Sequence, residues 1–296
     1  MPGTTIRKAV IPVAGFGTRM LPAAKAVPKE MVPILDRPTI QHVIEEAVAG
    51  GISDVLFITS RQKQAIEDHF NRNPELEDRL RNNDRLELLA SVDALIAKVT
   101  FHAVIQPVQR GLGDAVRQAR GHVGSDAFLC MLGDTVFNGQ LTPARQLIDA
   151  YATLGTTVIG LEEVPIEKVS RYGIVSGKDL GGAVFRLDGL VEKPSPQEAP
   201  SRLAIAARYV LTPVIFDCLD QTQPGRAGEV QLTDALRLML DRGEPIHGVV
   251  LHSKRHDVGN LFDWLTTNLL FASRDEKLWH QLRPMLESLL REEQTY

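Results

Sequence analysis

Residues 9–35 read "AVIPVAGFGTRMLPAAKAVPKEMVPIL", and this stretch decides the fold that we expect. It begins as an unbroken apolar run, which is typical of a strand covered on both faces. It then changes abruptly to glycine, threonine, arginine and lysine. Because open parallel sheets bind ligands beyond the carboxyl ends of their strands, the stretch predicts a strand tip that faces a ligand.

The strand tip has the residue types that bind phosphate. Gly15 and Gly17 lack a Cβ atom, so their amides can approach an anion closely, and successive N–H groups form an anion-binding concavity. Arg19 adds a planar fork of donors, and Lys25 and Lys29 follow within reach. The pattern is neither a dinucleotide fingerprint nor a Walker loop. Solvated surface charge is an equal alternative on this pattern alone.

Strand-like and helix-like segments alternate as far as residue 164. This alternation predicts an α/β fold with a doubly wound, mostly parallel mixed sheet, whose early strands are buried on both faces. From residue 171 to residue 228 the segments are strand-like and punctuated by glycine and proline, which predicts antiparallel strands and no helices. Helical patterns return at residues 229–243 and from residue 260 onward. We expect a single domain, 1–296.

The composition excludes several classes of protein. With 296 residues, 44% hydrophobic and 24% charged, the chain has the composition of a globular domain. A net charge of −4 argues against a nucleic-acid partner. No apolar run approaches the ~20 residues that span a bilayer, and no signal peptide is recognised, so we expect no membrane partner and a cytoplasmic location. Cys130 and Cys218 lie in apolar runs and are expected to be buried and unpaired.

Two aspartates follow apolar segments that are distant in sequence. Asp134 follows "FLCMLG", and Asp257 lies in "HDVGN" after "IHGVVLH". Strand-end carboxylates are common ligands of Mg²⁺, so the two could share one ion, although capping of a turn is a frequent alternative for such a residue. His256, beside Asp257, is expected to pack or to form hydrogen bonds.

These segments together carry a resemblance. The chain resembles the sugar nucleotidyltransferase family, and within it the bacterial UTP–glucose-1-phosphate uridylyltransferases. The matching motifs occur in the family's order from residue 8 to residue 260: the long stretch quoted above with its continuation to "VAGGI", then "QPVQRGLGDAV", "LGD", "YGIV", "LVEKP", "RYVL", "GEVQLTDAL" and "HDVGN".

The resemblance implies the reaction and its site. UMP would pass from UTP to glucose 1-phosphate, giving UDP-glucose and pyrophosphate, by Mg²⁺-assisted in-line attack on the α-phosphorus. It implies a nucleotide half at about 1–165, a small antiparallel sugar-binding half at 166–260 and C-terminal helices at 261–296, usually in a homo-oligomer. The implied nucleotide-binding residues are Ala14, Gly15, Gly17, Thr18, Gln106 and Gly111. The implied catalytic residues are Arg19, Lys29, Asp134 and Lys193, the sugar-binding residues are Gly173, Glu192 and Lys193, and the metal ligands are Asp134 and Asp257.

Some details distinguish branches of the family. Thymidylyltransferases usually have S-K-Q where this chain has residues 28–30, Pro-Lys-Glu, which favours the uridylyl branch. Ala207 stands where that branch has glycine, which leaves the hexose open. Glu192 and Lys193 are neighbours in a strand-like run, whose alternation would point them to opposite faces. Another nucleotide or hexose 1-phosphate, an inactive sugar-nucleotide-binding paralogue and a nucleotide-binding scaffold remain alternatives.

Overall fold

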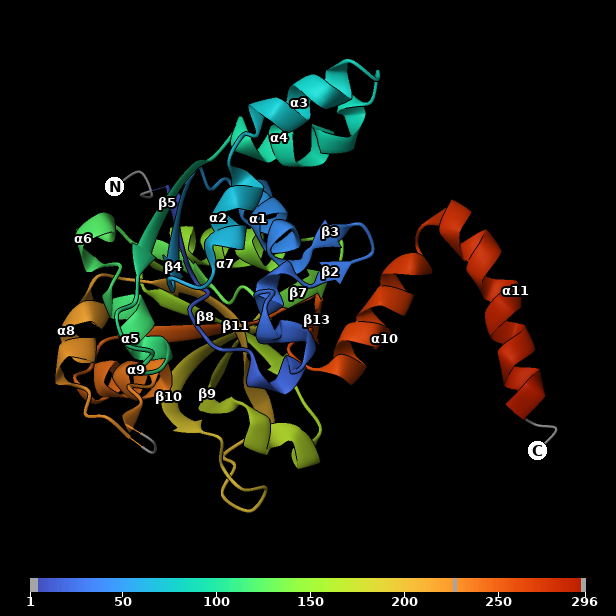
Figure 1. Ribbon diagram of the computed structural model, residues 1–296. Helices are drawn as coiled ribbons and strands as arrows, with labels where there is room; N and C mark the ends of the chain where they lie inside the picture. Colours follow the sequence, from blue (N-terminus) through green and yellow to red (C-terminus); the bar gives the residue numbers. More distant parts are fainter. Residues whose placement is uncertain (1–4, 226–227, 294–296) are drawn as a thin grey trace.

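The computed structural model describes residues 5–225 and 228–293 (Figure 1). The helices are α1 Thr39–Ala49, α2 Gln64–Phe70, α3 Pro74–Arg81, α4 Ala90–Ile96, α5 Leu112–Arg117, α6 Arg120–Val123, α7 Pro143–Leu154, α8 Val214–Gln221, α9 Leu232–Asp241, α10 Leu261–Ala272 and α11 Glu276–Glu293. The strands are β1 Lys8–Pro12, β2 Pro33–Ile34, β3 Arg37–Pro38, β4 Asp54–Thr59, β5 Thr100–Ile105, β6 Phe128–Met131, β7 Thr135–Asn138, β8 Thr157–Glu163, β9 Gly173–Gly181, β10 Val184–Glu192, β11 Leu203–Leu211, β12 Ile246–Val250 and β13 Lys254–Asp257.

A nine-stranded sheet forms the centre of the molecule, in the order β5-β4-β1-β6-β11-β8-β12-β10-β9. The first four strands of this order are parallel to one another, as are β8 and β12. Strands β11 and β10 run against their neighbours. The expected mostly parallel, mixed α/β sheet is therefore confirmed. The antiparallel strands extend this same sheet, and β11 lies in its interior.

Helices cover both faces of the sheet because the strands alternate apolar side chains between two cores. In β1, Ala9 and Ile11 pack into a core with α1 and α7, whereas Val10 packs into a core with α5, α8 and α9. Both cysteines are free and buried, as expected, and Cys130 belongs to the second core. Strand β1 is buried on both faces in the middle of the sheet. Its carboxyl end, and the glycines that follow it, lie where the parallel strands of the sheet end.

Two expectations about secondary structure were wrong. The segment between residues 171 and 228 contains α8, in a stretch that was expected to lack helices. Its β-branched and aromatic residues favour a strand by propensity, but Ile215, Phe216 and Leu219 bury at helical spacing. Strand β5 was expected to be covered on both faces, yet it forms an edge of the sheet and is exposed along most of its length.

Helix α10 is attached to the segment that contains β2. The indole nitrogen of Trp264, in α10, donates to the carbonyl of Pro33 at 2.8 Å, and the amide of Leu35 donates to Asn268 at 2.9 Å. Helix α11 then extends away from the body of the molecule (Figure 1). Within the described residues, none of the helices is both long enough and apolar enough to span a membrane.

Candidate active site

A cleft of about 1180 Å³ opens at the carboxyl ends of β1 and β6. Its lining comes from segments that are far apart in sequence, including the turn after β1, the start of α5 and the end of β10. The lining includes each residue that the family resemblance implied for the site: Ala14, Gly15, Gly17, Thr18, Arg19, Lys29, Gln106, Gly111, Asp134, Gly173, Glu192, Lys193 and Asp257. The structure thus brings these residues together, while their individual roles stay predictions.

The glycine turn is shaped for close approach. Gly17 has φ 67, a left-handed conformation that favours glycine, and a Cβ atom there would lie 3.2 Å from the Cβ atom of Lys29. At Gly15 a Cβ atom would meet nothing within 4 Å, so this backbone faces open space in the cleft. Lys25, which was grouped with Lys29 from the sequence, is exposed and does not line the cleft.

The two aspartates expected to bind metal lie on neighbouring backbone segments. The amide of Val258 donates to the carbonyl of Asp134 at 3.1 Å, and Asp257 pairs with Thr135 in a two-stranded sheet of β13 and β7. Asp257 comes after the strand "IHGVVLH", as expected from the sequence, and it ends a separate short strand, β13. A cation from the N-terminal part faces each carboxylate: Lys29 Nζ lies 2.5 Å from Asp134 Oδ2, and Arg19 Nη1 lies 3.6 Å from Asp257 Oδ2.

A row of acidic and basic side chains in alternation leads from Asp134 into the interior of the protein. Lys29 contacts Asp134 on one side and Glu30 at 4.0 Å on the other, and Glu30 receives two hydrogen bonds from Lys63, at 2.8 and 3.1 Å. The side chains of Glu30 and Lys63 are only 1% and 8% exposed. Buried charges are stable only when they are paired, so this chain of four residues fixes the position of Lys29.

The same chain sets the protonation states. Burial lowers the pKa of Lys29, but the charges of Asp134 and Glu30 outweigh burial and leave the pKa raised. Burial raises the pKa of Asp134, but Lys29, followed by Arg19, leaves it below its usual value. Both groups are therefore charged at neutral pH, and Asp134 is available to a cation as a carboxylate.

Beside the glycine turn, the side-chain amide of Gln106 has a fixed orientation. Its Nε2 donates to the carboxylate of Asp114 at 2.7 Å and to the carbonyl of Gly111 at 3.4 Å. Asp114 is itself held by Arg117. Since a carboxylate only accepts hydrogen bonds, the NH₂ group of Gln106 must point toward Asp114, and its Oε1 atom remains as an acceptor.

At the opposite end of the cleft, Glu192 and Lys193 lie together. Alternation predicted opposite faces for them, but Lys193 follows the last residue of β10 and has φ 46, which turns it out of the strand. Its Nζ lies 3.2 Å from Glu192 Oε1. Thr233 donates to Glu192 at 2.8 Å, and Gly173, opposite Glu192 in the β9–β10 pairing, leaves room for this carboxylate. The expectation of opposite faces was therefore wrong.

Sequence reasoning missed a cation in this part of the cleft. The side chain of Arg255 is only 7% exposed, and it pairs with Glu162 and lies 4.0 Å above the ring of Tyr172. Arg255 and Tyr172 both line the cleft. Arg255 precedes Asp257 by two residues in β13, so the alternation of the strand could have revealed it.

The backbone in the wall of the cleft is strained at Ala207. This residue lines the cleft and has φ 58, at an irregularity in β11 between Ile205 and Tyr209. A left-handed conformation is costly for any residue except glycine. The left-handed conformation explains why glycine would suit this position. The alanine side chain adds a methyl group to the wall of the cleft.

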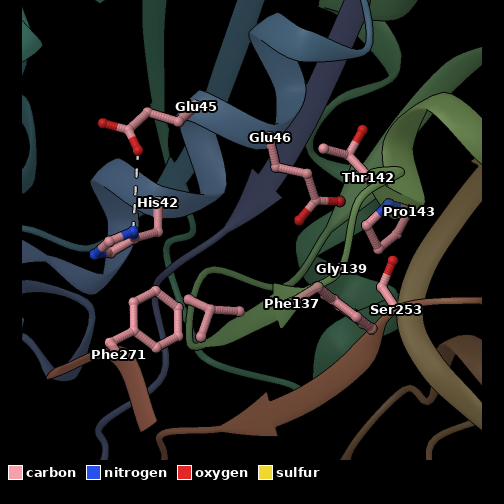
Figure 2. Close-up of a pocket in the computed structure, with 10 residues that line it drawn as sticks. His42, Glu45, Glu46, Phe137, Gly139, Thr142, Pro143, Ser253 and Phe271 are labelled. Carbon is pink, nitrogen blue, oxygen red and sulfur yellow. Dashed lines mark ion pairs between the residues drawn. The ribbon is translucent and has the colours of Figure 1, made fainter. Parts of the chain in front are cut away.

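A second cavity, of about 230 Å³, lies between α1, β7 and the start of α7, and none of the residues predicted for the site lines it (Figure 2). Glu46, one of its lining residues, pairs at 2.9 Å with Arg208, which is fully buried. The guanidinium of Arg208 also donates to the carbonyls of Leu132 at 3.3 Å and Thr135 at 2.7 Å. These two residues flank Asp134, so the pair fixes the backbone that carries this carboxylate.

Several known proteins are similar to this chain in sequence and in fold. A family model described as nucleotidyl transferase matches residues 8–274. The UTP–glucose-1-phosphate uridylyltransferase of Bacillus subtilis (strain 168) is 44% identical over 289 residues, which cover 98% of this chain and 99% of the relative. A UTP-bound UGPase from Acinetobacter baumannii has a TM-score of 0.88 at 35% identity, with 96% of this chain and 99% of the other covered. A UDP-glucose pyrophosphorylase complexed with UDP-glucose has a TM-score of 0.83 at 34% identity, with 91% and 99% covered.

The family match includes the glycine turn, both aspartates and the residues at the two ends of the cleft. The relative from B. subtilis matches almost end to end. The resemblance seen in the sequence motifs is thereby confirmed, and the chain belongs to the nucleotidyl transferase family.

Proposed function

We propose that this chain transfers UMP from UTP to glucose 1-phosphate, giving UDP-glucose and pyrophosphate. The observation that carries the proposal is the cleft itself, in which a glycine turn with Arg19 and Lys29 faces two neighbouring aspartates and a second lysine, Lys193. The names of its relatives support the same reaction, because they are uridylyltransferases and UDP-glucose pyrophosphorylases.

The chemistry requires charge compensation rather than a side-chain nucleophile. A phosphate monoester has a second pKa near ~6, so the sugar phosphate is largely dianionic at neutral pH and attacks without a general base. The obstacle is the repulsion between two anions, which amounts to several kcal/mol at an effective dielectric constant of ~20. In our proposal Arg19 and Lys29 bind the triphosphate, and Lys193 binds the sugar phosphate.

Asp134 and Asp257 fit a divalent cation, and we propose Mg²⁺. Hard carboxylate oxygens suit this ion, which keeps several of its waters. The lowered pKa of Asp134 keeps it ionised, and the adjacent backbones of the two residues support a shared site. When bound, the ion would neutralise phosphate oxygens of both reactants.

Recognition of the two substrates is divided between the ends of the cleft. The free Oε1 of Gln106 matches the N3–H donor of a uracil ring, whereas cytosine presents an acceptor at that position. Ala14, Gly15, Thr18 and Gly111 would complete the nucleotide site. Glu192, held by Thr233, would accept hydrogen bonds from sugar hydroxyls beside Gly173. Another hexose 1-phosphate remains the alternative, because Ala207 adds a methyl group at this end.

The test is a panel of nucleotides and sugar phosphates. Purified protein is incubated with UTP, dTTP, CTP or ATP and with glucose, galactose or mannose 1-phosphate, with Mg²⁺, and pyrophosphate release is measured. We expect the highest kcat/KM with UTP and glucose 1-phosphate. A preference for dTTP or for another hexose would reassign the substrate, and nucleotide binding without turnover would contradict the transferase activity.

We also propose that the chain forms a homo-oligomer in the cytoplasm. Helix α11 extends from the body and exposes Leu278, Met285 and Leu289 at helical spacing, which suits pairing with a second copy (Figure 1). Two free, buried cysteines are compatible with a reducing compartment. Light scattering tests the assembly: Leu289→Glu is expected to lower the molar mass to that of a monomer, whereas Lys277→Glu is not.

A further inference from the structure

Three potential metal ligands gather away from the cleft, near the amino ends of two neighbouring strands. Asp54 is the first residue of β4, His102 lies in β5, and His122 lies in α6. One ligand atom from each lies within 4.8 Å of the others. None of the three lines the active-site cleft, so the proposed transferase reaction does not account for them.

The spacing of the ligand atoms suits a tetrahedral ion. A zinc ion with bonds of about 2.0–2.2 Å holds its ligand atoms roughly 3.3 Å apart. Here the Nε2 atoms of His122 and His102 lie 2.8 and 3.8 Å from Asp54 Oδ1, which brackets that separation. The side chain of His102 is 45% exposed, so a small rotation closes the site, and solvent can supply a fourth ligand.

Strand pairing and the side chain of Lys8 hold the backbone around the cluster in place. The parallel pairing of β4 with β5 sets Leu56 opposite His102. Lys8, in β1, donates to the carbonyls of His122 at 3.2 Å and Val123 at 3.1 Å, which ties α6 to the sheet. The charge of Lys8 is compensated by Asp126 at 2.8 Å. The three ligands are therefore presented by well-positioned elements.

The hydrogen bond between His122 and Asp54 explains the position of His122 but not that of His102. His122 is satisfied by Asp54, but the ring of His102 lies 4.7 Å from the ring of His122 and forms no hydrogen bond with any described residue. Two imidazoles and one carboxylate that converge in this way form a donor set that zinc prefers, whereas Mg²⁺ prefers oxygen ligands alone.

We propose that Asp54, His102 and His122 bind a divalent transition metal, zinc by their ligand chemistry. The ion clamps the edge strand β5 and helix α6 to β4, at the opposite end of the sheet from the cleft. Its role is structural, and it is independent of the Mg²⁺ that we propose for Asp134 and Asp257.

Zinc titration by calorimetry tests the proposal, with Mg²⁺ in excess to occupy oxygen-only sites. We expect one tight zinc ion per chain, and a higher Tm with zinc than without it. Co²⁺ in the same site should give the intense visible absorption of a tetrahedral complex. His102→Ala and His122→Ala should each weaken zinc binding at least about tenfold, whereas the control His280→Ala, at an exposed position, should bind as the wild type does.

Two results would overturn the proposal: no zinc binding by the folded wild-type protein, or binding by His102→Ala as tight as that of the wild type. Because His102 is half-exposed in an edge strand, this variant is expected to fold, which circular dichroism verifies. The measurement does not depend on turnover, so it stands whether or not the proposed substrates are correct.

Discussion

The two lysines of the cleft differ in how the protein holds them. Lys29, at the proposed nucleotide end, is 19% exposed and lies 2.5 Å from Asp134 within a chain of buried charges. Lys193, at the proposed sugar end, is 57% exposed and has a left-handed backbone, and its side chain pairs with Glu192 at 3.2 Å. The proposed nucleotide end is thus organised around a network of buried charges, whereas Lys193 at the proposed sugar end is more exposed and pairs with Glu192. This difference predicts that the two ends respond differently to mutation.

The largest effect is expected at the organised end. Asp134→Asn removes a proposed metal ligand and the partner of Lys29, so kcat should fall roughly 10³-fold with Mg²⁺ present. Steady-state pyrophosphate release measures it. Asp149→Asn, on the exposed face of α7, is the control and should retain wild-type turnover. Near-normal activity of folded Asp134→Asn would show that the metal assignment is wrong.

A smaller and one-sided effect is expected for Lys193→Ala. Loss of a charge-assisted hydrogen bond of about 1.5–3 kcal/mol should raise the KM for glucose 1-phosphate by 10- to 100-fold, with little change in the KM for UTP. Lys178→Ala, an exposed change in β9, should alter neither constant. Equal losses for both substrates would contradict the proposed division between the two ends.

Selectivity rather than rate should change in Asp114→Asn. An asparagine can donate as well as accept, so it no longer dictates the orientation of Gln106. The ratio of kcat/KM for UTP over CTP should fall about tenfold, the equivalent of one hydrogen bond. Competition assays with both nucleotides measure this ratio. An unchanged ratio in a folded variant would mean that Asp114 does not position Gln106 for the base.

The smallest effect is expected at Ala207. Glycine relieves its left-handed backbone, so Ala207→Gly should raise the free energy of unfolding by up to about 1 kcal/mol, visible as a small rise in Tm. Ala206→Gly, a buried neighbour without a positive φ, should lower it instead. If both variants lose stability equally, the strain at Ala207 is energetically unimportant.

Sequence reasoning located the cleft because strand ends in a parallel sheet converge. This rule indicated the glycine turn after β1 and Asp134 after β6, and the family resemblance then assigned them to the site. The resemblance to the family identified the residues of the proposed sugar end, but it did not predict how their side chains are arranged. Alternation failed at Lys193 because its positive φ ends the strand, and such a conformation has no signal in a Glu-Lys-Pro segment.

The supporting pairs could not be predicted. Arg208 and Glu46 are separated by 162 residues, and their contact depends on how α1 packs against β11. Lys63 and Glu30 likewise meet only in the folded chain. No local pattern encodes such pairs. Tertiary packing decides them, although they hold the residues that the sequence did reveal.

The central claim is that Asp134 and Asp257 share one divalent ion between the two substrates. Crystals grown with UDP-glucose and Mn²⁺ test it, because the anomalous scattering of manganese distinguishes this ion from the lighter atoms of the protein and the nucleotide. We predict one peak within bonding distance of both carboxylates and of the nucleotide's phosphate. Manganese bound to only one of the two aspartates, or found away from the phosphate, would contradict the claim.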